Sequence, residues 1–207
     1  MSAVMALAPA ARVGADADVM AALARPDCAA AVWDRAAPDG VTAWLDGLEA
    51  DLLPRGRVVV RPDDVAWAVG DMCNTAGTPE GPVREAFVAD VAALADRFAA
   101  QMDAAWLRVR LDVVTTNACR KFHIDALRAR LVCTYRGTGT QYGMAAPRTE
   151  PAQVHTVPTG APILLRGTLW PAPEAGSLLH RSPPIEGTGE VRLVLVLDPM
   201  ERGEDDI

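Results

Sequence analysis

The stretch LRVRLDVVTT, residues 107–116, alternates apolar and polar side chains with a period of two. Successive side chains of a β-strand point to opposite faces, so this pattern predicts a strand whose apolar face is formed by Leu107, Val109, Leu111 and Val113. Shorter strand candidates follow, separated by turns that contain Gly or Pro: residues 130–136, 153–157, 162–168, 177–181 and 190–198. The second half of the chain is therefore predicted to be a succession of short strands.

The first 104 residues have a different pattern, which predicts mostly helix. Apolar residues recur at helical spacing in 17–35, in 40–53 and most clearly in 81–106. Residues 57–81 predict a short strand followed by an irregular loop.

Helices followed by a run of short strands indicate an α+β fold, with the helices packed on one face of a β-sandwich or barrel. We expect three parts along the chain. Residues 1–104 are a helical part packed on the β part, residues 105–200 are the β core, and residues 201–207 are an acidic tail.

Charge and composition argue against several classes of function. The net charge of −7 argues against non-specific binding to nucleic acid or to an anionic membrane. The four cysteines show no C-x-x-C spacing, which argues against a zinc knuckle. No apolar run reaches the roughly 18 residues that a transmembrane helix needs. We expect a cytoplasmic protein with reduced thiols and with no nucleic-acid or membrane partner.

Two of the three histidines fall in a pattern typical of a metal site. His123 and Asp125 form an H-x-D motif in a segment with strand character, where side chains two residues apart share a face. His180 follows several predicted strands later. Two histidines and one carboxylate make up the facial triad of non-haem Fe(II) oxygenases, which leaves coordination positions open for substrate and O₂.

A candidate anion-binding residue opens the last predicted strand. The leucines at 193, 195 and 197 share one face of this strand, so Arg192 lies on the other. The residues that share its face are Val194, Val196 and Asp198. At the rim of that face, the Arg192 guanidinium would receive a carboxylate through two parallel hydrogen bonds. Arg128 and Arg130 are alternative candidates for the same role.

A purely structural interpretation of these residues stays open. His123 and Asp125 would then be a hydrogen-bonded pair, and His180 a surface residue in a Pro-rich loop. His155 is a candidate third imidazole of a His-rich zinc site, although a half-exposed strand histidine suits its position better. Cys119, four residues before His123, suits an inert thiol better than a reactive one.

Five segments between residues 119 and 198 resemble the double-stranded β-helix core of the iron- and 2-oxoglutarate-dependent dioxygenases: CRKFHID, RLVCTYRGTGT, LLRGTLW, LLHRSPP and RLVLVLD. The pieces KFHxD, RLxxTYxGxGT, HRSP and RLxLxLD are more closely similar to a small bacterial family of uncharacterised proteins. Members of that family are often encoded beside zinc-handling GTPases. The resemblance covers about 80 residues, and the N-terminal half matches only in being helical.

This resemblance implies N-terminal helices packed on a C-terminal double-stranded β-helix, a jelly-roll or cupin-like barrel. His123, Asp125 and His180 would be the metal ligands, and Arg192 would hold the C5 carboxylate of 2-oxoglutarate. Tyr135 is a further candidate contact for this co-substrate, and it is equally suited to be a core aromatic. No catalytic residue is expected beyond the metal site. A zinc-handling GTPase becomes a candidate partner, and the resemblance identifies neither a small molecule nor a peptide as substrate.

Three functions remain as alternatives. The first is an Fe(II)/2-oxoglutarate-dependent oxygenase that hydroxylates an unidentified substrate. The second is a non-catalytic metal-binding accessory protein in zinc homeostasis, because zinc also accepts two histidines, one aspartate and a water. The third is a β-barrel binding module without a metal.

Overall fold

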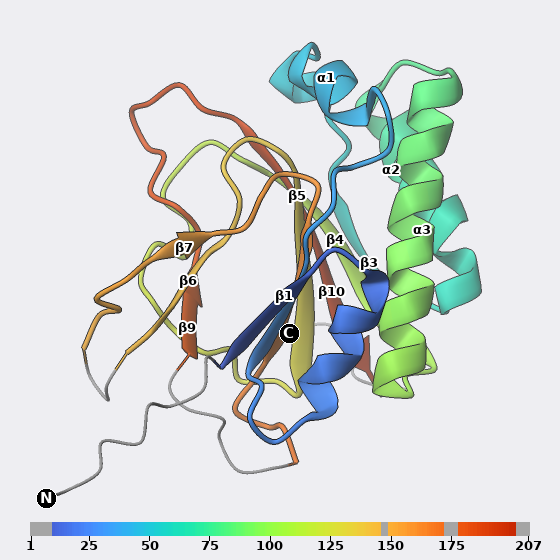
Figure 1. Ribbon diagram of the computed structural model, residues 1–207. Helices are drawn as coiled ribbons and strands as arrows, with labels where there is room; N and C mark the ends of the chain where they lie inside the picture. Colours follow the sequence, from blue (N-terminus) through green and yellow to red (C-terminus); the bar gives the residue numbers. More distant parts are fainter. Residues whose placement is uncertain (1–9, 146–148, 172–177, 202–207) are drawn as a thin grey trace, which may run out of the picture.

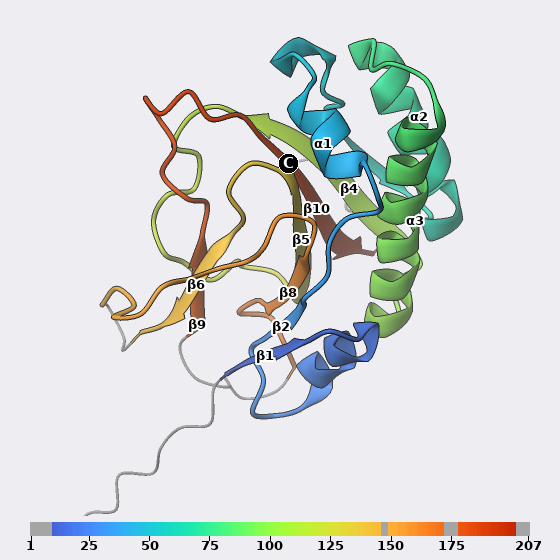
Figure 2. The same ribbon diagram turned by 45° about the horizontal axis from the view of Figure 1, so that its top comes forward.

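A computed structural model describes residues 10–145, 149–171 and 178–201. In Figure 1, helices α2 and α3 cover one face of a large sheet, and a smaller sheet lies on its other side. The turned view in Figure 2 shows the same three layers. Apart from Glu201, the predicted acidic tail lies outside the described residues.

Ten strands and three α-helices are assigned within the described residues. The strands are β1 (Ala11–Gly14), β2 (Ala30–Trp33), β3 (Gly56–Val60), β4 (Trp106–Val114), β5 (Ala129–Arg136), β6 (Gln141–Met144), β7 (His155–Thr156), β8 (Pro162–Arg166), β9 (Leu178–Arg181) and β10 (Arg192–Met200). The helices are α1 (Val41–Asp46), α2 (Val65–Ala76) and α3 (Pro82–Met102), with 3₁₀ turns at Ala17–Ala24, Ala50–Leu52 and Pro62–Asp64.

The large sheet has seven strands in the order β1-β2-β8-β5-β10-β4-β3, and all its pairs are antiparallel except β1 with β2. The small sheet has the order β7-β6-β9. β10 lies near the middle of the large sheet between β5 and β4, so its residues are buried along almost the whole strand.

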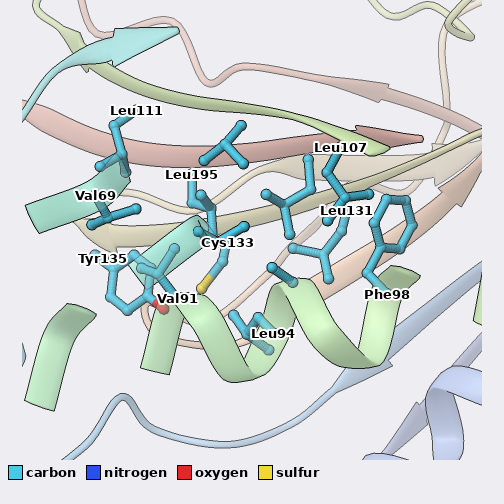
Figure 3. Packing of buried hydrophobic residues seen from close by; sticks show 14 of the residues in the cluster. Val69, Val91, Leu94, Phe98, Leu107, Leu111, Leu131, Cys133, Tyr135 and Leu195 are labelled. Carbon is cyan, nitrogen blue, oxygen red and sulfur yellow. The ribbon is translucent and has the colours of Figure 1, made fainter. Parts of the chain in front are cut away.

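The two faces of the large sheet belong to two separate cores. On the helix side, Leu131, Cys133 and Tyr135 of β5 and Leu195 of β10 pack against α3, as Figure 3 shows. On the other side, Val132, Val194 and Val196 pack with residues of the small sheet such as Tyr142 and Leu178. The predicted alternation along β10, leucines on one face and Val194 and Val196 on the other, is confirmed.

The helix predicted over 81–106 is confirmed as α3, although it ends four residues earlier than predicted. Pro82 occupies its first turn, where the missing N–H costs no hydrogen bond. It ends at Met102 because Asp103 takes the left-handed conformation, with φ of 50°. The predicted apolar face is buried at Phe87, Val91, Leu94 and Phe98.

The expectation of a helix over 17–35 is wrong in its second half, where β2 pairs with β8. The sequence AAVW of this strand is mostly buried on both faces, so it carries no alternation that distinguishes a strand from a helix. The irregular loop expected within 57–81 is also wrong, because it contains α2. Apolar residues at helical spacing bury one face of α2, although Gly70 and Asn74 lower its intrinsic helix propensity.

The α+β class is confirmed, with a large, mainly antiparallel sheet. Closure of the strands into a double-stranded β-helix stays a prediction, as does the cytoplasmic location. No helix within the described ranges has the length and apolarity needed to cross a membrane.

A buried ionic network attaches α3 to the sheet. Asp90 of α3 accepts two hydrogen bonds from the guanidinium of Arg35, at 2.6 and 2.8 Å. It also accepts one from the hydroxyl of Tyr135, at 2.6 Å. The Tyr135 ring meets Phe87 edge-on at 4.9 Å. Removing one member of such a network leaves its partners buried with unmet hydrogen-bonding capacity.

Tyr135→Phe should lower the free energy of unfolding by about 1–2 kcal/mol, because it deletes one buried hydrogen bond to a charged acceptor and leaves the Arg35–Asp90 pair in place. Urea denaturation measures this change. Tyr142→Phe is the matched control, because the Tyr142 ring stacks on His155 and its hydroxyl forms no hydrogen bond with any described residue. Equal midpoints for wild type and Tyr135→Phe would show that the hydroxyl contributes nothing.

Candidate metal centre

Two histidines that are far apart in the sequence lie side by side next to the small sheet. The backbones of His123 and His180 exchange two hydrogen bonds of 3.0 Å, which form an isolated β-bridge beside β9. Their ring centroids are 4.5 Å apart. The two imidazoles therefore lie next to each other because His123 and His180 are directly paired in the backbone bridge.

Asp125 reaches the same place by a different route from the one predicted. The sequence predicts that it shares a strand face with His123, but it lies past the bridge in an irregular segment. Its carbonyl accepts a hydrogen bond from Thr168 N at 2.9 Å. Gly167 permits this approach, because a Cβ there would lie 1.9 Å from the carbonyl oxygen of Leu127. Backbone contacts with 167–168, rather than strand alternation, position the carboxylate.

The three side chains have the spacing of metal ligands. Asp125 Oδ2 lies 3.1 Å from His180 Nε2, and Asp125 Oδ1 lies 3.7 Å from His123 Nε2. One ligand atom from each residue falls within a 4.8 Å span. Ligands bound at about 2.1 Å in tetrahedral or octahedral geometry lie about 3.0–3.4 Å apart. Small side-chain rotations would therefore suffice to close the cluster around a cation.

The protonation states of Asp125 and His180 suit metal binding. Burial alone would raise the pKa of Asp125, but the neighbouring imidazoles and the Arg130 guanidinium outweigh it and hold that pKa well below its usual range. Burial lowers the pKa of His180, so its ring is neutral at pH 7. The contact with Asp125 raises the pKa of His123, against the effect of burial. Since His123 Nδ1 lies 2.8 Å from the carbonyl oxygen of Lys121, Nδ1 carries the proton of the neutral ring and Nε2 is free to bind a metal.

A buried oxygen without a partner supports this fit. Asp125 Oδ2 is buried and forms no hydrogen bond with any described residue, although His180 Nε2 is only 3.1 Å away. A buried carboxylate oxygen in that condition is costly unless something else satisfies it. A divalent cation between Oδ2 and the two imidazoles would satisfy all three groups together, so the residues present fit such an ion.

The other oxygen of Asp125 is held by a chain of charged groups. Arg130 Nη1 donates to Asp125 Oδ1 at 2.7 Å. Its Nε and Nη2 bind the two oxygens of Asp198 at 2.7 and 2.8 Å. The bidentate pair fixes the guanidinium plane, and that plane fixes the Asp125 carboxylate. Sequence reasoning proposed Arg130 only as an alternative carboxylate clamp. The signal for this pairing was the position of Arg130 and Asp198 on inward-facing sites of neighbouring strands.

Arg192 lies on the predicted face of β10, but it is fully buried rather than at the rim. Its guanidinium donates to Thr138 O at 2.6 Å, to Ser182 Oγ at 2.7 Å and, at 3.4 Å, to Thr134 Oγ1. All three acceptors are uncharged, and none of the described carboxylates pairs with it. Burial lowers the pKa of Arg192 to about 10, so it is still a cation at pH 7.

The structure does not bring the other candidates to the cluster. The expectation that Tyr135 contacts a co-substrate there is wrong, because its side chain faces α3 on the opposite side of β5. His155 is exposed and stacks on Tyr142 instead of joining the histidine pair. Cys119 is an exposed free thiol beside a cavity of about 90 Å³ that His123, His180, Arg130 and Ser182 also line.

Residues 14–198 match the family described as protein of unknown function DUF1826. The chain belongs to this family. No curated protein matches the sequence. The gene neighbourhood beside zinc-handling GTPases, and such a GTPase as partner, stay predictions.

Several solved structures are similar in arrangement at low sequence identity. A rice dioxygenase for auxin oxidation is 15% identical, with 94% of this chain and 84% of that chain covered and a TM-score of 0.46. A Pseudomonas putida prolyl-4-hydroxylase is 18% identical, with coverage of 90% and 99% and a TM-score of 0.49. Arabidopsis thaliana DAO1, solved as a 2-oxoglutarate complex, is 12% identical, with coverage of 82% and 75% and a TM-score of 0.45. Likenesses at this level do not establish an activity.

Asp198→Asn should lower the affinity for a divalent metal by about tenfold or more, within the range typical of residues that orient a ligand. Without the Asp198 charge, Arg130 has Asp125 as its only anionic partner and competes with the metal for it. Titration of metal-free protein with Co(II), followed by its visible absorption, measures the change. Asp27→Asn is the control, because Asp27 also pairs with arginines, Arg12 and Arg25, but is more exposed and lies outside the cavity beside the histidines. Equal losses in the two variants would contradict the specific role of Asp198.

Proposed function

We propose that this protein is a non-haem Fe(II)/2-oxoglutarate-dependent oxygenase that hydroxylates an organic substrate. The observation that carries the proposal is the pairing of two features: a two-histidine, one-carboxylate cluster, and a fully buried arginine nearby without a carboxylate partner. Either feature alone is also compatible with a purely structural role. Together they supply one site for a metal and one for a carboxylate of the same ligand.

The spacing of these two features suits a five-carbon dicarboxylate. His180 and Ser182 are two residues apart in extended chain, which corresponds to about 6.6 Å, and Ser182 Oγ accepts from Arg192 at 2.7 Å. The terminal carboxyl carbons of 2-oxoglutarate are separated by four bonds of about 1.5 Å, or about 5 Å in extended form. A molecule that chelates a metal at the cluster would therefore place its far carboxylate beside Arg192.

The residues of the chain have separate tasks in this proposal. His123, Asp125 and His180 would hold Fe(II) and leave coordination positions open. Bound there, Fe(II) would supply the coupled oxidation in which O₂ converts 2-oxoglutarate to succinate and CO₂ and hydroxylates a C–H bond. Arg192 would orient the co-substrate and neutralise its C5 carboxylate. Val132, Val194 and Val196 would form an apolar wall that limits access of water.

We further infer that the two sheets are the two walls of a double-stranded β-helix. The small sheet carries His180 on β9, the large sheet carries Arg192 on β10, and the apolar side chains between them form a shared core. The His123–His180 bridge joins β9 of the small sheet to the segment that leads into β5 of the large sheet.

Anaerobic addition of Fe(II) and then 2-oxoglutarate to metal-free protein should produce a visible iron-to-ketoacid charge-transfer band. His180→Ala and Asp125→Asn should lose both metal binding and the band. His155→Ala should keep both, because this exposed histidine lies outside the cluster. Tight zinc binding without any response to 2-oxoglutarate would instead favour the metal-binding accessory protein, which uses the same ligands.

Arg192→Lys should weaken 2-oxoglutarate binding by about tenfold or more and leave the metal affinity within a few-fold of wild type. Lysine keeps the charge but loses the planar fork that binds a carboxylate through two hydrogen bonds. Titration of the band with 2-oxoglutarate gives the dissociation constant. Because Arg192 is buried, circular dichroism and urea denaturation must first show that the variant is folded. A folded variant with unchanged 2-oxoglutarate affinity would assign the carboxylate to another residue.

A further inference from the structure

A second and much larger cavity lies at the other end of the candidate metal centre. Its volume is about 740 Å³. It is lined by the end of α3, the first residues of β4, the last residues of β10 and the segment that follows Asp125. The inference drawn from it rests on the proposed function, because it concerns the substrate of that same site.

The order of groups along β10 connects this cavity to the cluster. β10 begins at Arg192 and ends at Met200, and its residues near the end, Asp198 and Met200, line the large cavity. Asp198 also holds Arg130, which holds Asp125. The cluster therefore lies between the buried guanidinium of Arg192 and the large cavity. A substrate in this cavity would approach the metal from the side opposite the co-substrate.

Size distinguishes the roles of the two cavities. Pockets for organic ligands usually measure about 300–1,000 Å³. The 740 Å³ cavity falls in this range, whereas the 90 Å³ space beside His123 and His180 does not. The large cavity has room for a substrate, and the small space suits only part of a compact molecule.

The charged groups of the large cavity favour an anion in its interior. Arg108 of β4 is half-buried, and its Nε is buried without a hydrogen-bond acceptor among the described residues. Asp198 faces it across the strand pair, but both oxygens of Asp198 are already bound to Arg130. The other cations, Arg61 and Arg128, are exposed at the entrance, as are the acids Asp103 and Glu201. In the interior of the cavity, the Arg108 guanidinium therefore has an N–H without an acceptor, and none of the described carboxylates there is left unpaired to accept it.

The remaining walls are apolar. Trp106 and Met200 line the cavity on the sheet side, and Leu127 and Leu169 line it on the side of the Asp125 segment. Leu169 is 66% exposed, so its side chain is accessible to a ligand in the cavity. Arg61, which also lines the cavity, lies over the Trp106 ring at 4.9 Å.

We propose that the 740 Å³ cavity binds the substrate, and that the substrate is an organic carboxylate with an apolar body. Arg108 receives the carboxylate, and Trp106, Leu127 and Leu169 contact the apolar part. Asp198 and Ala126, the residue after the metal ligand Asp125, line the cavity on the side of the metal centre.

The test uses 3-phenylpropionate and octanoate as probes, with 3-phenylpropanol and octanol as neutral analogues, on metal-free full-length protein. Calorimetric titration should show saturable binding of at least one acid and binding about tenfold weaker for its alcohol. Arg108→Gln should weaken binding of the acid by about tenfold and leave the alcohol unchanged. Arg57→Gln, the same change at an exposed arginine of β3, should match wild type. Failure of both acids to saturate, or equal affinities in Arg108→Gln and wild type, would overturn the assignment.

A second measurement tests whether the cavity adjoins the metal. Proton resonances of the bound acid should broaden in Co(II)-loaded protein relative to Zn(II)-loaded protein. Absence of broadening would overturn the cavity as the substrate site. Arg108-dependent binding in a protein that shows no charge-transfer band would refute the oxygenase and retain the anion site. A charge-transfer band together with Arg108-independent binding would refute only the substrate inference.

Discussion

The period of two in the central strands β5 and β10 is the constraint on which the rest of the structure depends. Each side chain of these strands faces either the helices or the small sheet, and both sides are buried. On the helix side, apolar surface packs against α3 at Leu131, Cys133 and Tyr135, and the Tyr135 hydroxyl forms one hydrogen bond. Arg130, Arg192 and Asp198 of the same strands lie on the other side. Since charge is costly in a buried layer, each of those residues must have a partner or a ligand.

Arg130 and Arg192 meet this requirement in opposite ways. Arg130 is paired with two carboxylates, so groups of the protein itself balance its positive charge. Arg192 is more deeply buried and donates only to uncharged oxygens. The two guanidinium groups lie on neighbouring strands of the same buried layer, but only Arg130 has carboxylate partners. That contrast separates Arg130, which positions Asp125, from Arg192, to which the proposed function gives the carboxylate of the co-substrate.

Local patterns predicted the elements whose sequence shows one apolar face and one polar face, such as α3 and β4. They failed for β2, where both faces are buried, because its run of alanine and valine has no alternation of apolar and polar residues. Two candidate ligands, His123 and His180, were predictable from residue type and order. The position of Asp125 was not predictable from strand geometry, because backbone contacts with Gly167 and Thr168 set it. Tyr135 was misplaced because a buried tyrosine suits a ligand pocket and a core equally well until its strand register is known.

Strand register also explains how a single element organises the whole candidate site. β10 places Arg192 at its start, Val194 and Val196 at the apolar wall, and Asp198 beside the large cavity, all on one face. A shift of its pairing by one residue would turn this face toward α3 and bring the leucines into the cavity. The leucines prevent that shift, because exchange with charged residues would place Arg192 and Asp198 in the apolar core under α3. The packing that stabilises the helix layer is therefore the same interaction that keeps Arg192 and Asp198 in order along the candidate site.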